Sequence, residues 1–296
     1  MRVTNSMVLR STMRDLQQSL GRLQDTQARI SSGKDFANAS DDPTRATAAF
    51  GLRRQLRRAE QRMRTMDDSV AFLRTSDVAL TSALDVLEQA KTVAVQAGNT
   101  GATTDANARA AMAKEIRSIR DELVTIANAR HGERSVFAGT AAGAAYSAGG
   151  AYLGDGGTVT RDVAAQTSVT VNVTGPAVFG VAGGAVGDVF EVLDRLAIAI
   201  ESGNSTAMAT EHGNLDAATS RVGAAAVEIG TKSARLESLR ERSVDEQLGL
   251  QRMLTETEDV DLVEALVTVK AQETSYQAAL QAAAMIVPPT LLDYLR

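Results

Sequence analysis

Two apolar stripes at opposite ends of the sequence constrain the fold more than any other feature. The N-terminal stripe consists of Leu9, Met13, Leu16, Leu20, Leu23, Gln27 and Ile30, and the C-terminal stripe of Leu262, Leu266, Val269, Glu273, Tyr276, Leu280 and Ala283. Both advance by alternating steps of four and three residues, which is the heptad spacing of a coiled coil. We therefore expect the two ends to wind around each other or around neighbouring subunits. Two separate amphipathic helices that each face a core are the alternative.

The composition favours helix–helix packing over an aromatic globular core. Hydrophobic residues make up 44% of the 296 residues, whereas aromatic residues make up 3% and tryptophan is absent. The net charge of −5 gives no electrostatic basis for nucleic acid or an anionic membrane as the main partner. Without cysteine the chain has no disulfide, thiolate metal site or cysteine nucleophile. No run of about 18 apolar residues predicts a membrane span, and residues 1–6 lack the apolar core of a signal peptide.

Start and stop signals divide most of the chain into helices. Gly33 is expected to end the first helix in the left-handed conformation. Asp42 is a predicted N-cap, Pro43 suits the first helical position, and Asp41 adds negative charge at that end of the helix dipole. Asp188 and Gly203 are expected to cap a later helix. The helices are predicted at residues 6–32, 43–97, 104–129, 189–201, 205–254 and 262–285.

The middle of the chain has a different texture and predicts a small β-rich insert. It is rich in Gly, Ala, Ser and Thr, residues 167–174 alternate apolar and polar side chains, and Gly175-Pro176 is a turn signal. The predicted fold is therefore mainly α: an elongated bundle of long helices with paired terminal coiled-coil helices and a β-rich middle insert. Its expected parts are coiled-coil assembly segments at 1–42 and 256–296, rod halves at 43–134 and 188–255, and a surface insert at 135–187.

Two charge clusters of opposite sign lie far apart in the sequence. The basic cluster comprises Arg53, Arg54, Arg57 and Arg58, and the acidic cluster comprises Glu256, Glu258, Asp259 and Asp261. A solvated helix face explains the arginines most simply. Nucleic-acid binding is disfavoured because no aromatic side chains lie nearby to stack on bases. Pairing between subunits is the third interpretation, in which the charges set the register of neighbouring helices.

The chain lacks the residue patterns of a catalytic or metal site. His131 and His212 are isolated from each other in the sequence, and helix capping explains Asp41 and Asp42. Residues 154–157 are glycine-rich, but no Lys-Ser/Thr pair follows as in a phosphate-binding loop. We therefore predict no catalytic, cofactor-binding or metal-binding residue, no cofactor, and a protein that is not an enzyme.

Several short motifs, in order at both ends, resemble the bacterial flagellin superfamily. They are residues 29–34 (RISSGK), 40–43 (SDDP), Asn128, 134–140 (RSVFAGT), 272–280 (QETSYQAAL) and 291–295 (LLDYL). The resemblance covers residues 1–140 and 190–296. Within the superfamily, the Asp-Asp-Pro sequence and the LLDYL ending are similar to the hook–filament junction branch rather than to filament flagellins. Pro288 and Pro289 depart from the pattern, because they must end the last helix early.

The resemblance implies a structural subunit of the flagellum at the hook–filament junction, exported through the flagellar type III apparatus. The expected partners are like subunits in a ring, another hook-associated protein, flagellin and an export chaperone. The resemblance also implies that the terminal helices form inner layers and that the middle insert faces outward. A short filament flagellin and an intracellular coiled-coil scaffold or adaptor are the alternatives. An enzyme such as a cell-wall hydrolase is disfavoured.

Overall fold

The computed structural model of the protein describes residues 5–99, 105–164, 167–184 and 186–286. It divides into two compact units. One, the terminal unit, combines Met1–Arg58 with Glu246–Arg296, and the other, the middle unit, is Ala59–Asp245. The predicted boundaries at residues 42, 134, 187 and 255 stay a proposal. Among the described helices, none combines the length and apolarity that a membrane span requires.

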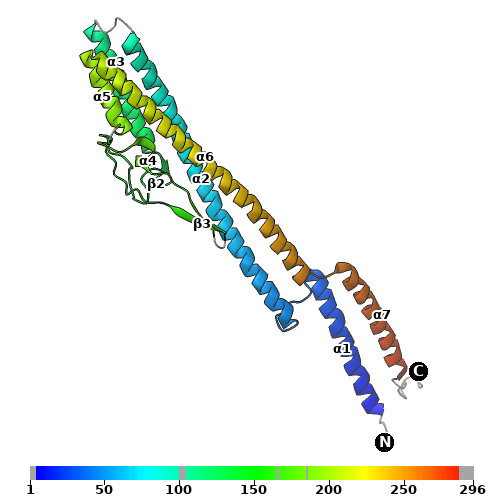
Figure 1. Ribbon diagram of the computed structural model, residues 1–296. Helices are drawn as coiled ribbons and strands as arrows, with labels where there is room; N and C mark the ends of the chain where they lie inside the picture. Colours follow the sequence, from blue (N-terminus) through cyan, green and yellow to red (C-terminus); the bar gives the residue numbers. More distant parts are fainter. Residues whose placement is uncertain (1–4, 100–104, 165–166, 185, 287–296) are drawn as a thin grey trace. The chain divides into compact units, whose positions relative to one another are not determined.

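The terminal unit is built from helices. It contains α1 (Asn5–Ser32), the beginning of α2 (Pro43–Asn99), the end of α6 (Ser205–Glu258) and α7 (Leu262–Ile286). Helices α1 and α7 lie side by side (Figure 1), so the two ends of the chain pair as predicted. Residues 287–296, which include Pro288, Pro289 and the LLDYL ending, lie outside the described residues.

The middle unit packs long and short helices around one hydrophobic core. The remainder of α2 and of α6 joins α3 (Ala106–Ala127) and α5 (Val189–Ser202), and α3 packs against α5. The core is aliphatic along the helices, as the composition predicts. Its fully buried residues include Leu73, Leu80, Leu87, Ile116, Leu123, Leu193, Leu196, Leu215 and Ile229.

The capping predictions for α5 are confirmed. Asp188 Oδ1 accepts a hydrogen bond from Glu191 N at 2.8 Å, and Gly203 ends the helix with φ of +69°. Asp105 caps α3 in the same way through Asn107 N. The caps use the free amides that every helix N-terminus carries, which is why they can be read from sequence.

The insert and the residues directly before it contain two short antiparallel hairpins and a helix. Strands β1 (Arg130–His131) and β2 (Arg134–Ser135) form one hairpin, and β3 (Thr160–Ala164) and β4 (Thr167–Thr170) form the other, with a register shift between Asp162 and Ala164. The aromatic residues of the insert cluster with one from α5 at ring distances of 5.0–5.7 Å: Phe137, Tyr146, Tyr152, Phe179 and Phe190.

The strand predicted over residues 167–174 ends at Thr170. Beyond it, the buried Asn172 side chain replaces ladder bonds, because its Oδ1 accepts from Val159 N at 2.8 Å and its Nδ2 donates to Gly157 O at 2.9 Å. The turn predicted at Gly175-Pro176 is instead the start of helix α4 (Gly175–Phe179), since proline suits the first turn of a helix.

Candidate functional site

The interface between α1 and α7 is a narrow seam with heptad spacing. On α1 the residues with low exposure include Thr12, Leu16, Ser19, Leu23, Thr26 and Ile30. On α7 they include Ala265, Val269, Gln272, Tyr276, Ala279 and Ala283. Every second position of each series is small or polar, which lets the two helix backbones lie close together. Among the described residues, the buried Gln272 Oε1 has no hydrogen-bond partner, so the seam is not optimised as an isolated pair.

The stripes predicted from sequence and the seam in the structure share half of their positions. Leu16, Leu23, Ile30, Val269 and Tyr276 are partly or fully buried. Glu273 and Ala283 are also partly buried. The other predicted positions with described side chains remain at least one-third exposed, and these are Met13, Leu20, Gln27, Leu262, Leu266 and Leu280. The side chain of Leu9 lies outside the described part of the chain. The role of the predicted stripes in assembly stays a prediction.

A backbone clamp joins the two loops that precede α2 and α7. Gly33 adopts φ of +71°, which turns the chain out of α1. Lys34 and Asp259 form an isolated antiparallel bridge, in which Asp35 N donates to Glu258 O at 2.8 Å and Val260 N donates to Gly33 O at 3.1 Å. Arg45 adds two hydrogen bonds to Thr257 O, at 2.7 and 3.1 Å. These contacts hold the bases of α1 and α7 together.

A buried glutamate lies at the centre of this clamp. Glu258 is 3% exposed, and its Oε2 lies 2.7 Å from Arg53 Nη2 and 3.2 Å from Lys34 Nζ. The hydrogen bond from Lys34 to Asp259, at 2.6 Å, is the largest cause that raises the pKa of the lysine above its ordinary value. Arg53 and Glu258, which the sequence assigned to opposite clusters, therefore pair within one chain.

The two aspartates before α2, Asp41 and Asp42, accept hydrogen bonds from different parts of the backbone. Asp42 Oδ1 accepts from Thr44 N at 3.1 Å and from Arg45 N at 2.9 Å, which confirms it as the cap of the helix that begins at Pro43. Asp41 Oδ2 instead accepts from Asn38 N at 3.0 Å and from Ala37 N at 3.3 Å, so it closes the preceding loop. The backbone hydrogen bond from Asn38 is the main cause that lowers the pKa of Asp41.

The Glu258→Gln variant is expected to lower the free energy of unfolding of the terminal unit by about 1–2 kcal/mol. The substitution keeps the shape but removes a charge that two cations share, and those cations are 43–44% exposed, so they can regain water. Hydrogen exchange at residues 33–42 and 257–261 measures the change. Glu256→Gln is the matched control, because Glu256 is exposed and should alter exchange little. Equal effects of both variants would contradict a clamp centred on Glu258.

The motif residues of the middle unit fasten the insert to the end of α3. Asn128 Nδ2 donates to Tyr146 O at 3.0 Å, and Tyr146 N donates to Asn128 Oδ1 at 2.9 Å. Asp155 Oδ1 accepts from Thr140 N at 2.8 Å and from Gly157 N at 2.9 Å, and its Oδ2 accepts from Thr140 Oγ1. The Thr140 hydroxyl is the main cause that lowers the pKa of Asp155 to about 2. From the sequence alone, Asp155 could be assigned only to a glycine-rich turn.

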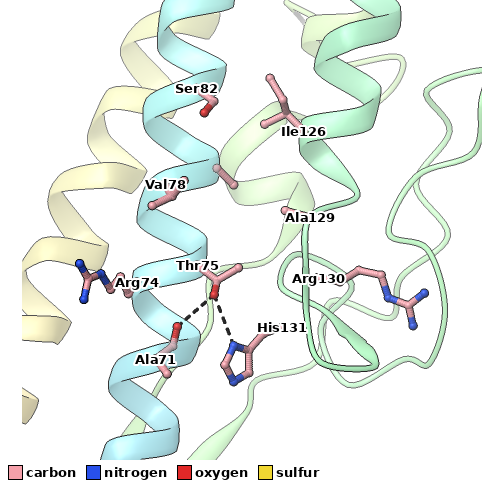
Figure 2. A pocket seen from close by; sticks show the side chains of 10 residues that line it. Ala71, Arg74, Thr75, Val78, Ser82, Ile126, Ala129, Arg130 and His131 are labelled. Carbon is pink, nitrogen blue, oxygen red and sulfur yellow. Dashed lines mark hydrogen bonds between the residues drawn. The ribbon is translucent and has the colours of Figure 1, made fainter.

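An apolar groove of the middle unit runs between α2 and α3. Its volume is about 490 Å³, and it is lined by Val78 and Ser82 of α2, by Ile126 of α3 and by Ala129, which follows α3. Arg74 and Arg130 also line it, but Figure 2 shows both guanidinium groups directed away from the groove. His131 closes one end, where its Nδ1 lies 3.3 Å from Thr75 Oγ1 (Figure 2). The groove offers apolar contact without a charged group that would select a substrate.

The two histidines lie on separate elements, and each has one aspartate beside it. His131 lies beside α2, whereas His212 lies on α6 next to Asp216, at 3.8 Å from Nε2 to Oδ2. Within the described ranges, no group of three or more His, Cys, Asp or Glu side chains is placed to hold a metal ion. Among the residues that the sequence singled out for assembly, the fold brings together those of the α1–α7 seam and of the clamp. These act by packing and hydrogen bonding.

Comparison with known proteins gives matches over most of the chain. The family model of the bacterial flagellin N-terminal helical region matches residues 3–142. Flagellar hook-associated protein 3 of Escherichia coli (strain K12) is 27% identical over 308 residues, which cover 95% of this chain and 96% of the relative. The protein of the same name from Salmonella typhimurium (strain LT2) is 26% identical over 94% of this chain and 95% of the relative. Flagellin of Bacillus subtilis (strain 168) is 27% identical, over 43% of this chain and 42% of its own.

Solved structures share the fold. A putative flagellar hook-associated protein from Vibrio parahaemolyticus superposes with a TM-score of 0.68 at 21% identity, over 74% of this chain and all of that one. The flagellar junction protein FlgL from Legionella pneumophila superposes with a TM-score of 0.56 at 15% identity, over 73% of this chain and all of that one.

Proposed function

We propose that the chain is a structural subunit of the bacterial flagellum at the hook–filament junction. Two similarities support this: residues 3–142 match the flagellin N-terminal family model, and the chain is similar over almost its whole length to flagellar hook-associated protein 3. The relatives are exported components of the flagellum, and this chain has the same place outside the cell. Its work is mechanical: it joins the hook-associated ring to the flagellin filament through packing between helices of neighbouring subunits.

The observation that carries the proposal is the apolar surface that α7 keeps beyond its seam with α1. Helix α7 is apolar on several faces, but α1 covers the face with Ala265, Val269 and Tyr276. Exposed apolar side chains on its other faces include Leu262, Val263, Leu266, Val267, Leu280 and Met285, with 43–86% of their surface accessible. A helix that is apolar all round is stable in water when neighbours cover it. A subunit of a tubular assembly supplies such neighbours.

The proposed partners follow from this uncovered surface and from the family. Like subunits in a ring would cover the outer faces of α1 and α7. Another hook-associated protein on one side of the ring and flagellin on the other would continue the helical layers. An export chaperone would shield the same apolar surface before assembly, because an uncovered helix of this composition favours aggregation.

Charge pairing between subunits is a further part of the proposal. Arg53 is engaged by Glu258 within the chain, but Arg54, Arg57, Arg58 and Glu256 are exposed in the terminal unit. Single exposed pairs contribute about 0–1 kcal/mol each. If such pairs were repeated around a ring, their main effect would be to set the register between neighbouring subunits, and they would add little to the strength of the contact.

Deletion of the gene in its host tests the proposal. Cells that lack the protein are expected to build hooks but to release flagellin into the medium instead of polymerising it, and the intact chain should restore filaments. Filaments of ordinary length on the deletion strain would overturn the proposal. The filament-flagellin alternative predicts long filaments from the purified chain alone, and the intracellular adaptor predicts that the chain stays out of the flagellar fraction.

A further inference from the structure

A pocket of the terminal unit lies beside the clamp, and we call it the clamp pocket. Its volume is about 340 Å³, and it is lined by the loop that follows α1, by the first three turns of α2 and by Glu258. Its apolar wall consists of Phe36, Ala37, Ala39, Ala46, Ala49 and Phe50. The cations that line it are Lys34 and Arg53, whose side chains are 43% and 44% exposed. The pocket therefore combines an apolar wall with positive charge that solvent reaches.

Phe50 is a lining residue that is large, apolar and open to water. It is 53% exposed, whereas the other five phenylalanines of the chain are buried or half-buried. Ala46 and Ala49, which lie beside it on α2, are 3% and 2% exposed, so the small wall residues are covered while Phe50 is not. Single exposed apolar residues are common on protein surfaces, but one that lines an apolar pocket offers contact to a partner side chain.

The face of α2 that carries Phe50 continues with positive charge. Arg54 lies one turn and Arg57 two turns beyond Phe50, and residues with these spacings share a helix face. Both arginines are exposed, whereas Arg53 is held by Glu258 at 2.7 Å. A partner that fits this surface therefore presents an apolar side chain to the pocket and a carboxylate one turn away.

The beginning of α7 has the complementary pattern. Val263 and Val267 are 74% and 67% exposed, and α1 leaves both uncovered. Glu264 is also exposed, and it lies on the same side of the helix one turn before Val267. An aliphatic side chain and a carboxylate thus stand one helical turn apart, as Phe50 and Arg54 do on α2.

Other exposed apolar groups of the terminal unit fit less well. On α1, Arg10 lies one turn before Met13, and on α6, Arg252 lies one turn after Leu248. These arginines would repel the cationic face of α2. The end of α7, residues 277–286, carries no charge. The positive charge on α2 therefore favours the beginning of α7 among these surfaces.

We propose that the clamp pocket of one subunit receives the beginning of α7 of a second copy of this chain, with Val267 against Phe50 and Glu264 at Arg54. The inference rests on the proposed function, because it names a contact by which like subunits form the ring. The two helices run antiparallel in this contact, since Phe50 precedes Arg54 and Val267 follows Glu264. The pocket and the α7 surface are different parts of one chain, so the contact is head-to-tail, which is the kind that builds rings.

A photoreactive group at position 50 identifies what occupies the pocket. Phe50 is replaced by the aromatic cross-linker p-benzoyl-phenylalanine in the full-length chain, which is expressed in cells that lack the gene. Illuminated flagella are expected to give a product of twice the subunit mass. In that product the cross-linker is joined to residues 253–270 of the second copy, a tryptic peptide that follows Arg252 and ends at Lys270. The dilute purified chain is the control, and it should remain a monomer after illumination.

Charge reversal tests the assigned pair. Arg54→Glu and Glu264→Arg should each lower the yield of this product about tenfold, because like charges then face each other, and the two changes combined should restore it. Both residues are exposed, so the unfolding midpoint should stay unchanged. Asp15→Arg is the matched control, because Asp15 is an exposed carboxylate on α1 that belongs to neither surface, and it should leave the yield unchanged.

The outcomes separate this inference from the junction role. If the wild-type chain restores filaments but the cross-linker is joined to flagellin, to another hook-associated protein, to a different segment of this chain or to nothing, the pocket assignment is overturned and the junction role stands. A double reversal that fails to restore the product overturns the pairing in the same way. If the wild-type chain restores no filaments, the junction role falls, and the inference falls with it.

Discussion

The Gly139→Ala variant is expected to lose about 3–5 kcal/mol of the free energy of unfolding of the middle unit. Gly139 is buried with φ of +76°, and a Cβ there would lie 2.2 Å from Asp155 Oδ1 and 2.7 Å from Gly157 N. Neither neighbour can move freely, because the carboxylate of Asp155 is itself held by Thr140 N and Gly157 N. The added methyl group must therefore open the turn that fastens the insert.

Gly143→Ala is the matched control for this prediction. Gly143 also has a positive φ, of +108°, but a Cβ there meets nothing within 4 Å. The Gly143→Ala variant should lose only the part of the free energy of unfolding that comes from the positive φ, about 1–2 kcal/mol. Urea unfolding followed by far-ultraviolet circular dichroism gives the two free energies, and hydrogen exchange at residues 137–157 locates the change. Similar losses in both variants would show that the contact with Asp155 is unimportant.

The helices of this protein could be predicted closely because their signals are local. Each helix end depends on groups within a few residues of it, so residue type and spacing identify it. Asp42 and Asp188 accept hydrogen bonds from free amides of the first turn, and Gly203 ends α5. The flagellin-like motifs indicated the family whose model matches residues 3–142 for the same reason: they are short and lie in order along the chain.

The insert and the clamp could not be predicted in detail, because distant residues hold them. Asp155 is bound by Thr140, Asn172 by Val159, and Glu258 by residues more than 200 positions earlier in the sequence. Periodicity carries no information on such pairs. Lys34 was consequently missed as a partner of the acidic cluster, although it lies in a motif that the sequence singled out, and Arg45 was missed as a partner of the Thr257 carbonyl.

The phase of the seam is a different problem, since α7 offers more than one stripe with heptad spacing. The sequence favoured the stripe with the most leucine, which includes Leu266 and Leu280. In the chain itself, α1 covers the stripe that includes Ala265 and Ala279, because small residues allow the backbones to approach closely. The large side chains remain outside the pair. An interaction between subunits explains why a helix would carry two apolar stripes when its own chain covers one.

The Val267→Lys variant is expected to fold normally and to abolish assembly into the flagellum. Val267 is 67% exposed on α7, outside the seam with α1, so the isolated chain already tolerates water there. In the proposed assembly the same position is covered by a neighbouring subunit. A lysine buried there without a partner would cost several kcal/mol at each subunit contact. Urea unfolding of the monomer and filament formation by complemented deletion cells measure the two effects separately.

Val227→Lys provides the matched control for this prediction, because Val227 is 71% exposed on α6 in the middle unit. The substitution is the same and the exposure is similar, but the residue is not on a terminal helix. We expect this variant to restore filaments as the wild type does. If Val267→Lys also restores filaments, the outer face of α7 stays in contact with water in the flagellum, and the apolar residues that surround it need another explanation. If both variants fail with unchanged monomer stability, the surface that joins subunits extends beyond the terminal helices to α6.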